Sequence, residues 1–224
     1  MGFIDIPAEQ TTAFTDLLLS AFAVLTAAYI ARRGGGMNTF RKVIWFWAFE
    51  FLAVAAIVGA IAHGFEMPGS LNDGIWNIIN FSLGMTIALF LIGTVRDLKG
   101  DRFSLMFLYV MIGISLGFFI VTVLVPGIFL IFIIYESIAM LFAFGAYCYL
   151  YLKRRFPGSG FIAVAILITM IAAAIQATES IGMTVIWEFD HNGIFHIVQM
   201  LALPLFAVGL SRSNNEEGKT EDLD

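Results

Sequence analysis

The sequence predicts an all-α integral membrane protein, a seven-transmembrane helix bundle with its N-terminus outside and its C-terminus in the cytoplasm. Three observations predict it. Of the 224 residues, 60% are hydrophobic and only 13% are charged, whereas soluble domains average about 45–50% apolar and about 25% charged. Apolar runs of the length that spans a bilayer, about 20 residues, fill nearly the whole chain. Every lysine and arginine falls on one side of those runs.

The apolar runs define the seven predicted helices in order. They are residues 11–31, 43–63, 74–95, 104–125, 127–152, 159–183 and 193–211. The first run is preceded by Asp5 and Glu9 and not by a basic segment, so we expect a retained helix rather than a cleaved signal peptide. Residues 1–211 then form one membrane domain, and the polar residues 212–224 form a disordered cytoplasmic tail.

The charged residues predict the orientation of the helices. Basic residues lie between the first and second, third and fourth, and fifth and sixth helices, and after the seventh. The opposite loops contain no basic residue and carry Glu66, Asp73, Glu188 and Asp190. The positive-inside rule therefore places the basic side in the cytoplasm. We expect a multi-pass protein of the plasma membrane or a bacterial inner membrane, with membrane lipids as partners and no surface for nucleic acid.

All three histidines are predicted to lie at one depth near the outer side. His63 ends the second helix, about 31 Å from Lys42 at 1.5 Å per residue. His191 and His196 precede or begin the seventh helix, and His196 is about 24 Å from Arg212 on the same scale. Three histidines and a water form an open zinc site in many enzymes. The alternative interpretation is that these histidines are ordinary polar residues at helix ends.

The spacing of the last two histidines restricts the metal-site hypothesis. Positions i and i+5 of a regular helix are about 140° apart around its axis. Either His191 lies in the loop before the helix, or only His196 binds the metal. Asp190 and Asn192 are residue types that cap helices, which favours the first arrangement. Asn192, His196 and Gln199 share one helix face.

Further polar residues gather toward the outer side. Asp73 opens the third helix, where it is equally interpreted as an N-cap. Glu136 is an acidic residue at membrane depth, which is costly and marks a functional site by default; we expect it to orient a histidine or to relay protons. The residues predicted to support the metal site or line a substrate pocket are Asn77, Asn80, Glu136, Gln176, Glu179, Asn192 and Gln199.

This arrangement resembles the CREST superfamily, which includes the alkaline ceramidases and the progestin and adipoQ receptors. The resemblance rests on the seven helices, on His63 at the end of the second, on Asp73 shortly after it, and on His196 in the seventh. The orientation is similar to that of the ceramidase branch. Two motifs depart from the family. Gly59 stands at the serine of Ser-x-x-x-His, and Asn192 stands at the first histidine of His-x-x-x-His, with His191 one residue away.

The resemblance implies a zinc-dependent intramembrane hydrolase of a lipid amide or ester, with its site near the outer leaflet. His63, His191 and His196 would hold the zinc, and Asp73 would act as general base on the metal-bound water. Two other classes stay open. One is a receptor or sensor of the same fold with a structural metal, which Gly59 favours. The other is a haem-binding or transport protein with His63 and His196 as axial ligands.

Overall fold

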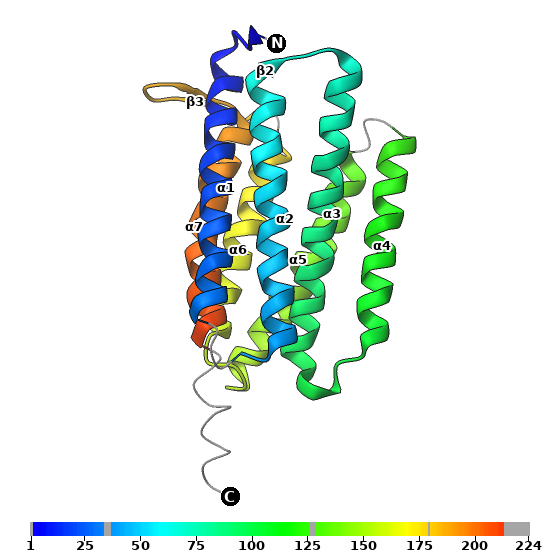
Figure 1. Cartoon of the computed structure of the whole chain (residues 1–224). Helices are drawn as coiled ribbons and strands as arrows, with labels where there is room; N and C mark the ends of the chain where they lie inside the picture. The colour runs from blue at the N-terminus through cyan, green and yellow to red at the C-terminus, as the bar shows by residue number, and fades with distance from the viewer. Residues whose placement is uncertain (1, 34–36, 126–128, 179, 213–224) are drawn as a thin grey trace, which may run out of the picture.

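The computed structural model describes residues 2–33, 37–125, 129–178 and 180–212, which form a bundle of helices (Figure 1). Within these ranges all seven helices are long and apolar enough to cross a membrane. This confirms the predicted all-α seven-helix architecture and fits a multi-pass membrane protein. The helices are α1 (Pro7–Arg33), α2 (Thr39–Gly64), α3 (Gly69–Lys99), α4 (Leu105–Leu124), α5 (Phe129–Leu152), α6 (Ser159–Gln176) and α7 (His191–Arg212).

The end of the sixth helix differs from the prediction. We expected it to continue to residue 183, but α6 ends at Gln176, and the backbone N–H of Ala177 caps it by bonding to the carbonyl of Ala173. The following segment is rich in polar residues and glycine, which favour turns over helix. It leads into a hairpin of β3 (Met183–Thr184) and β4 (Glu188–Phe189). Residues 127 and 128 and the predicted tail from 213 onward lie outside the described residues.

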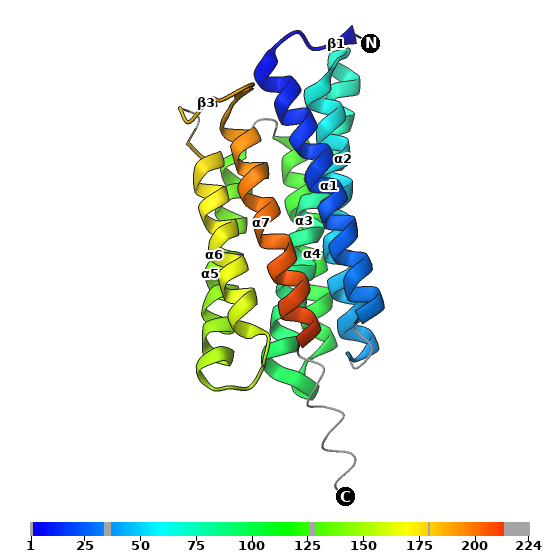
Figure 2. The same ribbon diagram turned by 90° about the vertical axis from the view of Figure 1, so that its left-hand side faces the viewer.

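Six of the helices form a ring, and α4 lies outside it. α1 packs on α2 and α7, α6 packs on α7 and α5, and α3 packs on α2 and α5. Figure 2 shows α7 between α6 and α1, which is where the ring closes. α4 packs on α3 and buries the smallest share of its surface among the seven spans. The chain's first and last helices are therefore neighbours in the bundle.

An aromatic cluster packs in the interior of the ring, beside the cavity described below. Trp45 of α2 is fully buried, and its ring meets the ring of Phe90 of α3 edge-on at a centroid distance of 5.2 Å. Phe206 of α7 contacts Phe49 and Phe90 at centroid distances of 5.8 and 5.6 Å. Gly93 permits this packing, because a Cβ there would lie 2.6 Å from Cε2 of Trp45. The cluster joins α2, α3 and α7 across the interior.

A buried ion pair joins three helices at the end of the bundle where α2 begins. Arg41 of α2 pairs with Asp97 of α3, whose side chain is completely buried. Tyr147 of α5 donates a hydrogen bond to the same carboxylate at 2.8 Å. The guanidinium of Arg41 also lies over the ring of Phe156, 4.9 Å from its centroid. Charged groups inside a membrane bundle require such partners, so this cluster sets the relative positions of α2, α3 and α5.

The opposite end of the bundle is tied by a short strand pair. β1 (Gly2–Phe3) pairs in antiparallel fashion with β2 (Phe65–Glu66), directly after α2. The N–H of Ile4 also donates to the carbonyl of Gly64 at 3.1 Å. The segment before α1 is thereby held against the end of α2, where His63 lies.

The close approach of α6 to α7 generates a stability prediction. A Cβ added at Gly158 would lie 1.7 Å from the carbonyl oxygen of Gly209, so Gly158→Ala must push the two backbones apart. Overpacking of this kind costs about 1–3 kcal/mol or more. We expect a clearly lower thermal unfolding midpoint for the detergent-purified variant.

Gly145→Ala in α5 is the matched control, because a Cβ there meets no atom within 4 Å. Its midpoint should stay the same or rise, since alanine favours helix over glycine by about 0.5–1 kcal/mol. Equal effects of the two substitutions would contradict the described packing of α6 on α7.

Candidate functional site

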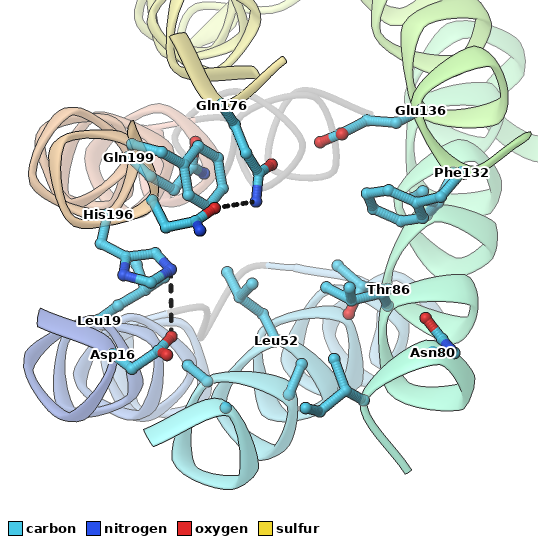
Figure 3. Close-up of a pocket in the computed structure, with 18 of the residues that line it drawn as sticks. Asp16, Leu19, Leu52, Asn80, Thr86, Phe132, Glu136, Gln176, His196 and Gln199 are labelled. Atoms are coloured by element: carbon cyan, nitrogen blue, oxygen red, sulfur yellow. Dashed lines mark hydrogen bonds and ion pairs between the residues drawn. The ribbon is translucent and has the colours of Figure 1, made fainter. Parts of the chain in front are cut away.

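A cavity of about 880 Å³ lies inside the bundle and is lined by residues from all seven helices (Figure 3). It reaches the end of the bundle where α2 ends and α7 begins, which we call the histidine end. Many of the side chains that line it deeper in the bundle are apolar, among them Leu52, Phe90, Leu203 and Phe206. Its titratable lining residues are Asp16, His63, Asp73, Glu136, His191 and His196. The cavity thus joins a polar region to an apolar one.

The cavity brings together nearly all of the residues that the sequence singled out. Asp73 lies exposed at its rim, whereas His196 and Gln199 are buried. Glu179 lies outside the described residues. The predicted residues that line the cavity are His63, Asp73, Asn77, Asn80, Glu136, Gln176, His191, Asn192, His196 and Gln199.

His196 is held between two side chains of α1. Its Nε2 lies 3.2 Å from Oδ1 of Asp16, and its Nδ1 lies 3.0 Å from the hydroxyl of Thr15. All three residues are buried, and His196 is 6% exposed. Both ring nitrogens therefore have partners at the contact where α1 meets α7.

The hydroxyl of Thr15 restricts where the protons of His196 lie. It donates to the carbonyl oxygen of Thr12 at 2.9 Å. A hydroxyl has one proton, so its oxygen accepts the Nδ1–H of His196. The contact between Nε2 and Asp16 then needs a proton on one of them, either as imidazolium with carboxylate or as imidazole with carboxylic acid. His196 and Asp16 thus form a couple between which a proton can move.

His63, the last histidine of α2, has a different partner. Its Nδ1 lies 2.7 Å from Oε2 of Glu9 in α1, and its ring meets Trp76 edge-on at a centroid distance of 5.8 Å. Asp16 and Asp190 are near enough to interact with it electrostatically. Among the described residues, none forms a hydrogen bond or ion pair with its Nε2. A carboxylate therefore orients this imidazole and leaves one nitrogen for another partner.

Asp190 fixes the start of α7. One oxygen of its carboxylate accepts from the N–H of Gly193 and from the hydroxyl of Thr12, each at 2.8 Å. This is the geometry of a helix N-cap, and it makes His191 the first residue of the helix. The expectation that His191 belongs to the preceding loop is therefore wrong, although its side chain still lines the cavity.

Gly59 has a structural reason to be a glycine. It lies one turn before His63 in α2, and a Cβ added there would lie 2.9 Å from Oδ2 of Asp16. The carboxylate of Asp16 thus takes the space that a serine would need at this position. Glycine in place of the serine of the Ser-x-x-x-His motif thus leaves room for the carboxylate of Asp16.

Sequence reasoning missed Asp16 and Glu9 as site residues. The signal for Asp16 was available, since an acidic residue within an apolar membrane run is a functional candidate, the argument we applied to Glu136. Glu9 precedes the apolar run and reads as an ordinary first-turn acid. Only the packing of α1 on α2 brings it to His63.

In the described part of the chain, the three histidines of the predicted zinc site do not gather around one point. Thr15 and Asp16 engage both ring nitrogens of His196, which also opposes its use as an axial haem ligand. Among the described residues, no three His, Cys, Asp or Glu side chains group closely enough to hold a metal ion, and zinc enzymes use three protein ligands. Zinc, and the role of Asp73 on a zinc-bound water, stay predictions of the resemblance.

Comparison with known proteins adds one match. The model of a family described as "Family of unknown function (DUF6962)" matches residues 11–215, which include all seven helices. No curated protein and no solved structure matches the chain.

The contact between Gly59 and Asp16 predicts a pair of coupled substitutions. Gly59→Ala alone presses on the Asp16 carboxylate and should destabilise the protein by about 1–3 kcal/mol. In an Asp16→Ala background the added methyl group meets no carboxylate, so Gly59→Ala should cost little there. Thermal unfolding of the four proteins measures the coupling, which for contacting residues is about 0.5–3 kcal/mol.

Gly64→Ala serves as the control, because its Cβ would make only an ordinary contact, 3.4 Å from Cβ of Ala13. If Gly59→Ala costs the same with and without Asp16, the two residues do not touch as described.

Proposed function

Since the chain belongs to DUF6962, a family of unknown function, we propose its function from the cavity: a membrane-embedded hydrolase that cleaves a lipid amide or ester. The observation that carries this proposal is a histidine oriented by a carboxylate on the wall of a cavity that is polar at one end and apolar at the other. An amphiphile fits such a cavity with its chain among the aromatic residues and its polar linkage at the histidine end.

His63 is the general base of the proposed reaction. With Nδ1–H donating to Glu9, the neutral imidazole has its lone pair on Nε2. A carboxylate that holds a histidine in one tautomer is the arrangement that hydrolases use to activate a nucleophile. Nε2 takes a proton from a water whose oxygen attacks the substrate carbonyl carbon. When the tetrahedral intermediate collapses, that proton passes to the leaving amine or alcohol.

The charge that develops on the carbonyl oxygen needs hydrogen-bond donors. Gln176 and Asn192 line the cavity, and Nε2 of Gln176 donates to Oδ1 of Asn192 at 3.4 Å. This bond uses the carbonyl oxygen of Asn192 and one N–H of Gln176. The NH2 group of Asn192 and the second N–H of Gln176 stay available to donate to a substrate. The His196–Asp16 couple offers a second place for a proton at the same end of the cavity.

A receptor or sensor is the second candidate function. It is favoured by the burial of His196 and by the engagement of both of its ring nitrogens, which make this histidine a link between α1 and α7. In that case the cavity binds a lipid and does not cleave it.

Turnover in bilayers tests the proposal. Protein in liposomes with N-acyl and O-acyl lipids should release fatty acid. His63→Gln should lower the rate by about 10²–10⁴-fold, as the loss of a general base does. Glu9→Gln should lower it less, and Glu50→Gln, a glutamate of α2 that does not line the cavity, should leave it unchanged.

Two outcomes separate the alternatives. Lipid binding without release of fatty acid from any substrate overturns the hydrolase and supports the receptor. Activity that a chelator abolishes and zinc restores shows that His63 acts as a metal ligand, as the resemblance implies, and not as the base.

We also propose that the histidine end faces the outside, with the site near the outer leaflet and the N-terminus external. The described basic residues lie at the opposite ends of the helices, which the positive-inside rule places in the cytoplasm. In a Cys148→Ser background, Ser70→Cys should react with a membrane-impermeant maleimide added to intact cells. Lys153→Cys should react only after permeabilisation, and the reverse pattern would invert the orientation.

A further inference from the structure

Among the hydrogen-bonding groups of the cavity wall that lack partners in the described residues, two lie away from His63, on α5 and α7. The Oε1 of Gln199 in α7 is buried and accepts no hydrogen bond. Glu136 of α5 makes no hydrogen bond or ion pair with a described residue. Buried polar groups are rarely left unpaired, because each costs the free energy of its lost hydration. Gln199 is buried and Glu136 is half-buried on the wall of the cavity, so both indicate a ligand that supplies the missing hydrogen bonds.

Glu136 and Gln199 lie on the side of the cavity that α5, α6 and α7 form. In Figure 3 the side chains of Glu136 and Gln176 point toward each other from α5 and α6, and Gln199 lies on the adjoining wall of α7. Gln176 uses an N–H for Asn192, so its carbonyl oxygen is a further acceptor facing the space. The group that fits between them must donate several hydrogen bonds.

The charges of the residues that line the cavity further restrict the chemical class of the ligand. Among the described residues that line it, Asp16, Asp73 and Glu136 are acidic, and none is lysine or arginine. A carboxylate in the membrane interior is costly unless a cation pairs with it. An ammonium group provides a positive charge and three N–H donors. An anionic headgroup would meet only acids, histidines and neutral groups.

The surroundings of Glu136 are apolar. Phe132 and Met140, one turn before and one turn after it on α5, line the same cavity, as do Ile87 and Phe90 of α3. A ligand that places a cation at Glu136 therefore has room for a hydrocarbon chain beside it. This combination describes an amphiphilic amine.

We propose that the cavity binds the ammonium group of an amphiphilic amine at Glu136, with Gln176 and Gln199 as further acceptors. The inference rests on the proposed function only in placing the ligand in the same cavity. The subsite belongs to α5, α6 and α7 and is separate from the His63–Glu9 pair of α1 and α2.

Binding of four probes that each carry one eight-carbon chain to protein in phosphatidylcholine nanodiscs tests the inference, with the signal of empty nanodiscs subtracted. Octylamine should bind at least about tenfold more tightly than octanol or octyltrimethylammonium, because only it combines charge with N–H donors. Octanoate should not compete. Equal affinities for octylamine and octanol, measured on the unaltered protein by calorimetric titration, overturn the inference.

Single substitutions test which side chains cause the preference for octylamine. Glu136→Gln keeps the size of the side chain and should lose about tenfold in octylamine affinity while octanol binding is unchanged. Gln199→Leu should weaken octylamine binding less, and Glu50→Gln should have no effect. An octylamine preference that survives Glu136→Gln overturns the assignment of the subsite.

The test is independent of turnover. An octylamine preference that depends on Glu136, in a protein that releases no fatty acid, supports the subsite and refutes the hydrolase. Release of fatty acid without any preference for octylamine does the reverse.

Discussion

The polar contact between α1 and α7 is the interaction on which the rest of the arrangement depends. Helices in a lipid bilayer gain little from burying apolar surface against each other, so packing and hydrogen bonds decide which helices meet. Here Thr15 and Asp16 hold both nitrogens of His196, and Thr12 bonds to the residue that caps α7. These bonds join the first helix to the last and close the ring around the cavity.

The two ends of the ring are held by different chemistry, and the cavity lies between them. At the basic end, Arg41 and Tyr147 both bond to the carboxylate of Asp97, and the aromatic cluster packs without space for a Cβ at Gly93. Toward the histidine end, polar groups line an open volume, and Glu136 and Gln199 lack partners among the described residues. Charged groups that bond to one another indicate a structural role, whereas polar groups without partners around a cavity indicate a ligand.

The helices and their order could be predicted because an apolar run of about 20 residues has few alternatives to a membrane helix. The end of α6 was predicted too late, because the turn-favouring residues after Gln176 are followed by further apolar residues that lengthen the apolar run. The gathering of His63, His191 and His196 followed from counting residues along antiparallel spans. Asp16 could be recognised as an acid within an apolar run, but its partner His196 could not, because that contact depends on which faces of α1 and α7 meet.

By itself, the sequence determined that the chain forms seven membrane-compatible helices and that its histidines lie at one end of them, since hydrophobic length and depth are properties of each segment alone. Only the tertiary structure decided the partner of each histidine, since partners depend on which helix faces meet. It assigned Asp16 and Thr15 to His196 and Glu9 to His63. The position of Asp16 against Gly59 likewise arises from contact between α1 and α2, which no local pattern in either helix encodes.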